Sequence, residues 1–178
     1  PALALRRDGA RPGDLLYVSG WPGEAAAGPE ALRKGAGSMD DPLVRRCRYA
    51  EPRVALGRAL RGRASAAMDV SDGLLGDLAK LCAASGVGAV IDLERLPVSD
   101  ELARRVPAAE CERLVLSGGD DYELLFTLPE AVATEVESIA SPELPLHCIG
   151  RIEAGRGVRC RRDGRPVKCA SGGYDHFA

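Results

Sequence analysis

The chain has 178 residues, which is enough for one domain that buries its own core without disulfide or metal staples. Its 24 basic and 26 acidic residues give a formal net charge of −2, which excludes the strong positive field typical of nucleic-acid-binding domains. Aromatic residues are only 4% of the chain, and no apolar run is long enough to cross a membrane.

The six cysteines include no C-x-x-C pair, and there are only two histidines, so a zinc site is not expected. We interpret the cysteines as small buried hydrophobic residues of a protein in the reducing cytoplasm. The N-terminal residues do not resemble a signal peptide, because their charges follow the short apolar run. Two arginine-rich stretches are interpreted as solvated faces: Arg45, Arg46 and Arg48, and Arg159, Arg161 and Arg162.

The first half of the chain predicts alternating strands and helices. The spacing of Leu74, Leu78 and Leu81 is helical, and Ser85-Gly86 ends that helix. The expected elements are, in order, a strand over 15–20, a helix over 23–34, a loop over 38–42, a helix over 54–60, a strand over 64–70, the helix that starts at Leu74, and a strand over 87–93. The last three are typical of a βαβ unit.

The second half predicts short helices followed by strands. We expect helices over 100–105 and 108–113, a strand over 122–127, a helix that opens at Pro129-Glu130, a strand over 147–152, and a hairpin of residues 158–161 and 166–169 around Asp163-Gly164. The sequence has no internal repeat and no low-complexity linker.

An acidic turn follows the predicted strand over 64–70. Asp69 and Asp72 stand where that strand ends and a helix begins, and Mg²⁺ prefers such hard oxygen ligands together with substrate phosphates. Gly73 would let a phosphate approach the backbone near the positive end of the helix. The alternative is helix capping by Ser71 or Asp72, which needs no function but explains only one of the two acids.

A glycine-acid turn precedes the strand over 122–127. Gly118-Gly119 permits unusual backbone angles, and two acids follow. Adjacent strand residues point to opposite faces, so we expect either Asp120 or Asp121 to bind a cationic or amino-bearing substrate while the other is structural. The alternative is an ordinary solvated turn.

Two further candidates lie near the ends of the chain. Tyr174 follows two glycines and could stack on a heteroaromatic ring, or pack against the core. Arg7 could reach a phosphate, or belong to a flexible arm. The sequence has no Walker A loop and no nucleophile–base arrangement, so a nucleotide-using enzyme would need phosphate-binding parts from elsewhere.

Taken together, five segments resemble the thiamine-monophosphate kinase family: Arg7–Asp14 followed by Leu16–Gly20, Arg48–Val54, Met68–Leu74, Ser117–Leu124 and Gly173–Phe177. That family belongs to the ATP-binding superfamily of aminoimidazole ribonucleotide synthetase. The resemblance implies an α+β fold, with helices packed on a mixed β-sheet. It also implies that residues 1–178 are the single C-terminal domain of such a kinase, with 1–14 as an arm from the interdomain junction and no counterpart of the N-terminal ATP- and Mg²⁺-binding domain.

The resemblance further implies an ATP- and Mg²⁺-dependent transfer of a phosphoryl group to thiamine monophosphate, giving thiamine diphosphate, without a catalytic His or Lys in this chain. The implied roles are Mg²⁺ ligands at Asp69 and Asp72, ATP contacts at Ser71 and Arg7, and substrate contacts at Asp120 and Tyr174. The family typically has Glu where this chain has Asp120. The implied partners are the missing N-terminal domain and, in the complete enzyme, a second copy in a homodimer.

Two alternatives remain open. The isolated chain could be a non-catalytic module that binds substrate without turning it over. The chain could also come from another superfamily member, such as a selenophosphate synthetase or a hydrogenase-maturation protein, although those need a reactive Cys near one terminus.

Overall fold

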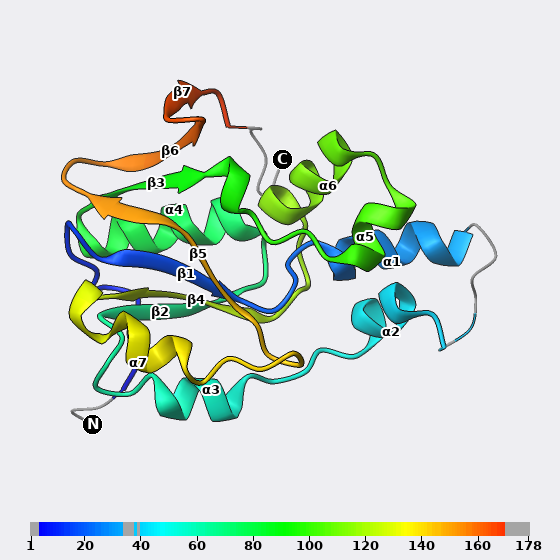
Figure 1. Ribbon diagram of the computed structural model, residues 1–178, viewed down its shortest axis with the longest axis horizontal. Helices are drawn as coiled ribbons and strands as arrows, with labels where there is room; N and C mark the ends of the chain where they lie inside the picture. The colour runs from blue at the N-terminus through cyan, green and yellow to red at the C-terminus, as the bar shows by residue number, and fades with distance from the viewer. Residues whose placement is uncertain (1–3, 34–37, 39, 170–178) are drawn as a thin grey trace.

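The computed structural model describes residues 4–33, 38 and 40–169 (Figure 1). The strands are β1 (Leu15–Ser19), β2 (Ala66–Val70), β3 (Gly88–Asp92), β4 (Glu123–Leu128), β5 (Leu146–Glu153), β6 (Gly157–Arg162) and β7 (Arg165–Val167). The α-helices are α1 (Glu24–Arg33), α2 (Pro42–Arg48), α3 (Val54–Ala59), α4 (Leu74–Ser85), α5 (Asp100–Arg105), α6 (Ala108–Ser117) and α7 (Ala133–Glu137). Two 3₁₀ turns, η1 (Leu93–Arg95) and η2 (Glu130–Val132), follow β3 and β4.

The strands form one sheet in the order β2-β4-β1-β5-β3-β6-β7. Every neighbouring pair is antiparallel except β3 and β6, which are parallel, so the sheet is mixed. The expected α+β fold, with helices on a mixed sheet, is confirmed. The strand–helix–strand succession β2-α4-β3 is also present, but β4, β1 and β5 lie between its two strands.

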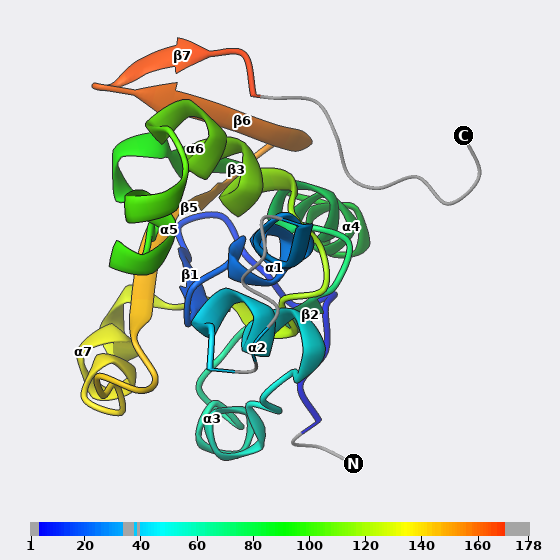
Figure 2. The ribbon, with the colours of Figure 1, turned by 90° about the vertical axis from the view of Figure 1, so that its right-hand side faces the viewer.

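Two hydrophobic clusters fill the interior on opposite faces of the sheet. The larger contains residues of α1, α4 and α6, such as Ala27, Leu78 and Val115. The smaller surrounds the stacked rings of Tyr17 and Phe126 and includes side chains of α3 and α7. Figure 1 shows α3 and α7 together below the sheet, whereas α1, α2, α5 and α6 gather at its right-hand end. Seen from that end, α1 lies next to α2 at the centre of the helices (Figure 2).

The helix that carries the acidic turn owes its position to its apolar stripe. Leu74, Leu78, Leu81 and Cys82 are all buried, at the helical spacing expected from the sequence. The helix ends at Gly86, which adopts a left-handed conformation with φ of 70°. The packed stripe therefore holds the N-terminus of α4 firmly at the end of β2.

One helix was not expected from the sequence. α2 begins directly after Asp41, whose carboxylate accepts hydrogen bonds from the N–H groups of Leu43 and Val44, with Pro42 at its first position. Asp-Pro is a helix-start signal, but it lies in the stretch interpreted as a loop. α6 also extends past Arg113 to Ser117, because its last turn is buried in the larger cluster.

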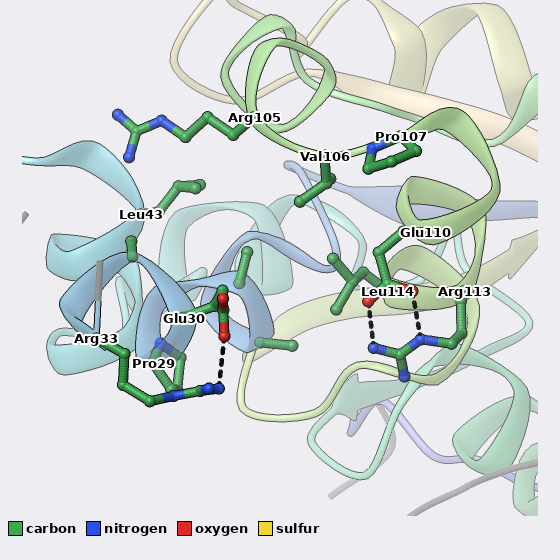
Figure 3. Close-up of a pocket in the computed structure, with 13 residues that line it drawn as sticks. Pro29, Glu30, Arg33, Leu43, Arg105, Val106, Pro107, Glu110, Arg113 and Leu114 are labelled. Carbon is green, nitrogen blue, oxygen red and sulfur yellow. Dashed lines mark hydrogen bonds and ion pairs between the residues drawn. The ribbon is translucent and has the colours of Figure 1, made fainter.

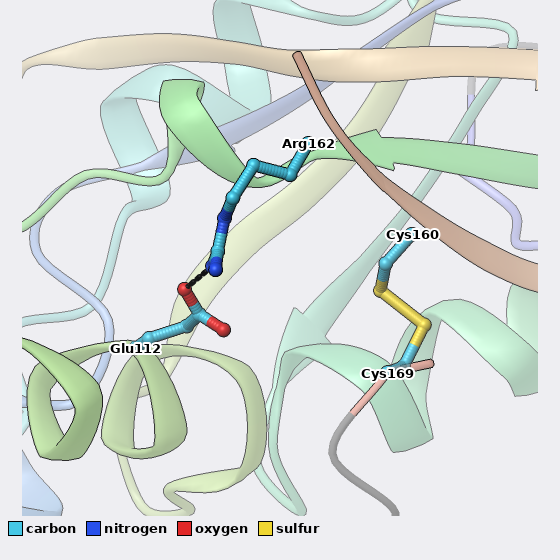
Figure 4. Close-up of a disulfide and its surroundings, with 4 residues drawn as sticks. All are labelled: Glu112, Cys160, Arg162 and Cys169. Atoms are coloured by element: carbon cyan, nitrogen blue, oxygen red, sulfur yellow. Dashed lines mark hydrogen bonds and ion pairs between the residues drawn. A yellow bond between two sulfur atoms is a disulfide. The ribbon is translucent and has the colours of Figure 1, made fainter. Parts of the chain in front are cut away.

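The prediction that all cysteines are free is wrong for one pair. Cys160 and Cys169 form a disulfide with a Cα–Cα separation of 5.5 Å (Figure 4). The β6–β7 hairpin brings them together, since Cys160 pairs with Val167, two residues before Cys169. The other four cysteines, Cys47, Cys82, Cys111 and Cys148, are free and partly or fully buried, as expected.

The N-terminal segment over 4–14 packs along the domain. The N–H of Ala67 in β2 donates to the carbonyl of Arg6, and the N–H of Gly13 donates to the carbonyl of Ile152 in β5. Ala10 is buried. No helix in the described part of the chain is long and apolar enough to cross a membrane.

Truncation of Leu78 tests the role of the α4 stripe. Because Leu78 is fully buried, Leu78→Ala should lower the free energy of unfolding by about 2–5 kcal/mol, measured by urea denaturation. Val167→Ala removes methyl groups from the exposed hairpin and should cost less than about 0.5 kcal/mol. Equal losses for the two variants would contradict this assignment of the core.

Candidate functional site

The backbone of the acidic turn between β2 and α4 is hydrogen-bonded by a side chain of α4 itself. The buried carboxylate of Asp77 accepts hydrogen bonds from the N–H groups of Ser71 and Asp72, at 2.8 and 2.9 Å to its Oδ2. The N-cap of α4 is Gly73, with φ of 103° and no side-chain cap. The alternative that Ser71 or Asp72 caps the helix is therefore wrong, because Asp77 satisfies the backbone of the turn instead.

Asp77 was missed by the sequence reasoning, although a signal was present. It lies three residues after Leu74, on the apolar stripe of the helix, and its side chain has no exposed surface. A carboxylate at such a position is costly unless it is hydrogen-bonded, so an acid there indicates a partner nearby. Lys80 supplies a further partner, since its Nζ lies 2.8 Å from Asp77 Oδ1.

Lys80 also contacts the acidic turn itself. Its ammonium forms an ion pair with Asp72 Oδ2, so one cation joins the buried Asp77 to the partly exposed Asp72. The hydrogen bonds to Asp72 and Asp77 raise the pKa of Lys80 above its usual value, so the ammonium is charged at neutral pH.

The glycine-acid turn lies directly against the acidic turn. The N–H of Asp120 donates to the carbonyl of Ser71 at 2.9 Å, and the N–H of Tyr122 donates to the carbonyl of Val70 at 2.8 Å. A Cβ on Gly119 would lie 2.8 Å from the carbonyl oxygen of Ser71, so the close approach requires glycine there.

We expected one of the two adjacent acids to be structural and the other to bind substrate. The structural role is confirmed for Asp121. Asp121 is buried, and its carboxylate accepts hydrogen bonds from the N–H groups of Gly23 and Ala25 at the start of α1. Asp120 has a left-handed backbone with φ of 65° and is exposed. Its role as the substrate contact stays a prediction.

A cavity of about 490 Å³ opens where the two turns meet. It is lined by Ala26, Ser71, Asp72, Arg113, Leu114, Ser117, Gly118, Gly119 and Asp120. Ser117, which also lines the cavity, has a buried Oγ with no hydrogen-bond partner among the described residues. The structure thus brings together Ser71, Asp72 and Asp120, three residues singled out in the sequence.

Asp69 is exposed near the end of β2, but it does not line this cavity. Met68 and Val70 pack on the larger cluster, whereas Ala67 packs on the smaller one, and strand alternation places Asp69 on the side of Ala67. The joint coordination of one cation by Asp69 and Asp72 stays a prediction.

Arg7 lies at the other end of α4. It lines an open surface pocket with Arg6, Asp8 and Ala84, and its carbonyl accepts a hydrogen bond from Ser85 Oγ. A helix rises about 1.5 Å per residue, so this end is roughly 16 Å from the acidic turn. The structure therefore does not bring Arg7 to the cavity. The predicted contact at Tyr174 lies outside the described residues.

A buried ion cluster supports the start of β4. Glu123 has no exposed surface and accepts hydrogen bonds from Arg46, Arg53 and Ser19. Burial acts to raise the pKa of Glu123, but these hydrogen bonds and the arginine charges outweigh it and hold the pKa below its usual value. The interpretation of Arg46 as part of a solvated face is wrong, because this side chain is only 14% exposed.

A second cavity, of about 570 Å³, lies between α1, α2 and the corner that joins α5 to α6 (Figure 3). Apolar side chains such as Leu43, Val106 and Leu114 line it, and ion pairs Arg33–Glu30 and Arg113–Glu110 lie at its rim. None of the predicted site residues that the structure describes, which excludes Tyr174, lines this cavity.

The donor set at the first cavity fits a partial Mg²⁺ site. Within the described ranges, no group of three or more His, Cys, Asp and Glu side chains is placed to hold a metal ion alone. Mg²⁺ does not need such a group, since it is usually bound by one or two carboxylates, waters and substrate phosphates. The partly exposed Asp72 carboxylate offers the hard oxygens that this arrangement requires.

The fold and the paired turns define a C-terminal domain of the AIR synthase type. The family model described as AIR synthase related protein, C-terminal domain, matches residues 11–163. This chain therefore belongs to that family.

Individual relatives are similar along nearly all of the chain. The thiamine-monophosphate kinase of Salmonella typhimurium is 44% identical over 98% of this chain, which covers 56% of that protein. The crystal structure of thiamine-monophosphate kinase from Stenotrophomonas maltophilia has a TM-score of 0.83 at 41% identity and covers 93% of this chain and 54% of its own. The structure of AaThiL complexed with AMPPCP and TMP has a TM-score of 0.78 at 35% identity, over 97% of this chain and 54% of its own. The resemblance recognised in the sequence motifs is thus confirmed, and the chain spans about half the length of these relatives.

The buried carboxyl of Asp121 makes stability depend on pH. Burial raises its pKa to about 7, against the opposing effect of the N–H groups of Gly23 and Ala25. An unfolded Asp titrates near about pH 4, so between these values the folded state holds a proton that the unfolded state has released. The stability from this group is present below about pH 4 and declines as the pH rises to about 7.

We therefore expect the stability difference between wild type and Asp121→Asn to shrink as the pH rises from about 4 to 7, by as much as about 4 kcal/mol. Urea denaturation at several pH values measures this difference. Asp100→Asn, at an exposed position in α5, should give a flat difference. A difference for Asp121→Asn that stays constant or grows with pH would contradict the prediction.

Proposed function

We propose that this chain is the C-terminal part of an enzyme that transfers a phosphoryl group from ATP to thiamine monophosphate, giving ADP and thiamine diphosphate. The observation that carries the proposal is the 44% identity to a thiamine-monophosphate kinase along 98% of the chain. The cavity shared by Ser71, Asp72 and Asp120 supports it, because it joins an acidic turn to a glycine turn at the start of a helix.

The proposed phosphoryl transfer requires this chain mainly to position the substrates. The attacking oxygen belongs to a phosphate that is already anionic at neutral pH, so a strong general base is not needed. No His or Lys is among the described residues that line the cavity. Catalysis would depend on alignment and on neutralising the charge of the transferred group, which is the chemistry that bound Mg²⁺ supplies.

The roles proposed for Asp72, Ser71 and Asp120 are supported by the cavity that they share, whereas those of Asp69, Arg7 and Tyr174 rest on the family resemblance alone. Asp72, together with Asp69, would hold Mg²⁺ beside the nucleotide phosphates, and Ser71 would contact those phosphates. Asp120 is exposed and lines the same cavity, where its negative charge suits a cationic substrate. The roles of Arg7 as an ATP contact and of Tyr174 as a substrate contact remain part of the proposal. Arg7 lines a different surface pocket, and Tyr174 lies outside the described residues.

The chain covers only about half of its kinase relatives, so an N-terminal domain is part of the proposal, as is a homodimer of the complete enzyme. We also propose a cytoplasmic location, where ATP is available. The Cys160–Cys169 disulfide points to an oxidising environment instead. Alkylation of the protein in acid-quenched cells, read by mass spectrometry, distinguishes the two, since a cytoplasmic protein should carry this pair as thiols.

The alternative of a non-catalytic module concerns the isolated chain. We expect the 178 residues alone to release no ADP from ATP and thiamine monophosphate. The same chain joined to the N-terminal half of a matched kinase, called the joined protein below, should release it. ADP formation is the measurement. ADP release by the isolated chain would refute the module hypothesis, and no release by the joined protein would count against the kinase function.

Replacing Asp72 tests the metal role in the joined protein. Asp72→Asn keeps the size of the side chain but removes its charge, so we expect turnover to fall at least about 100-fold with an unchanged circular dichroism spectrum. Asp100→Asn removes a charge at an exposed position in α5 that does not line the cavity, so it should retain turnover. Full activity of Asp72→Asn at ordinary Mg²⁺ concentrations would exclude Asp72 as a ligand.

A further inference from the structure

We propose that Lys80 is an internal counterion that occupies Asp72 in the metal-free protein and competes with the divalent cation for that carboxylate, so that Lys80 sets how tightly the acidic turn binds metal. The inference rests on the proposed function, because it takes Asp72 as a metal ligand.

Asp77 holds the Lys80 ammonium independently of Asp72. Asp77 has no exposed surface, and its Oδ2 is occupied by the N–H groups of Ser71 and Asp72. Its Oδ1 lies 2.8 Å from Lys80 Nζ. If Lys80 left, a buried carboxylate would lose its only charged partner among these contacts, which is costly. Lys80 therefore remains near the turn whether or not Asp72 is free to pair with it.

Asp72 is the weaker of the two attachments of Lys80. Its side chain is 36% exposed and lines the cavity, so water screens its ion pair with Lys80. A divalent cation at the cavity would need the lone pairs of Asp72 that the ammonium now occupies. The cation would also approach a unit positive charge held a few ångströms away, which lowers its affinity.

The same contact stabilises the turn before metal binds. Asp72 precedes α4 and Asp77 lies in its first turn, so without Lys80 their charges would repel across the start of the helix. The ammonium neutralises this repulsion, so the two effects of Lys80 have opposite signs. It raises the stability of the metal-free protein and lowers the affinity for metal.

The test uses the joined protein with Mn²⁺ as the probe and AMPPCP as the nucleotide. Free Mn²⁺ is followed by electron paramagnetic resonance, and thermal unfolding is followed separately without metal. Lys80→Met removes the charge and keeps the length of the side chain. We expect it to bind Mn²⁺ about three- to fivefold more tightly than wild type, the factor that corresponds to the upper range for losing one exposed competing ion pair. Its metal-free Tm should fall by about 2–4 °C.

Arg104→Met is the matched control. It also removes one positive charge and one ion pair between residues three apart on a helix, Arg104–Glu101, but it does not touch Asp72. We expect its Mn²⁺ affinity to stay within about twofold of wild type. Lys80→Arg keeps the charge and should remain close to wild type, and Lys80→Gln replaces Lys80→Met if the latter does not fold.

The outcomes separate this inference from the proposed function. Unchanged or weaker Mn²⁺ binding by the uncharged Lys80 variants, while Asp72→Asn still loses binding, overturns the role of Lys80 alone. Equal Mn²⁺ binding by wild type and Asp72→Asn overturns the metal role of Asp72, and the role of Lys80 falls with it. Tighter Mn²⁺ binding by the uncharged variants together with a lower metal-free Tm supports the proposal. Loss of a merely structural residue would lower both the Mn²⁺ affinity and the Tm.

Discussion

The backbone contact between the exit of β2 and the entry of β4 is the constraint on which the candidate site depends. Two N–H groups after Gly119 donate to carbonyls of Val70 and Ser71, and the glycine leaves no room for a side chain between the turns. Because β2 and β4 are also neighbours in the sheet, the two turns cannot separate without breaking the strand pairing. The cavity is therefore a product of the sheet, not of flexible loops.

Buried carboxylates make this arrangement rigid. Asp77 holds the acidic turn, Asp121 holds the start of α1, and Glu123 holds two arginines from the α2–α3 region. Each would be costly alone, and each has backbone or cationic partners that offset all or part of the cost of burial. Two further acids line the cavity: Asp120, which is exposed, and Asp72, which is partly exposed and paired with Lys80.

Much of the architecture followed from local patterns. The spacing of Leu74, Leu78 and Leu81 predicted α4, and the turn signal at Asp163-Gly164 predicted the β6–β7 hairpin. The patterns failed where a tertiary contact decides the structure. α2 was missed because a short helix depends on packing against α1, and α6 was cut short because its last turn is helical only when buried.

The sequence by itself determined the acidic and glycine turns as units, because both depend on residue types at fixed spacing. It also determined the family, through motifs that run in order along the chain. Only the tertiary structure decided which acids face the cavity, that Asp77 rather than Ser71 or Asp72 satisfies the turn, and that Arg7 lies at the far end of α4. Spacing describes neighbours along the chain, whereas these contacts join residues by the packing of a helix on a sheet and by the order of its strands. One sequence pattern is compatible with several such arrangements.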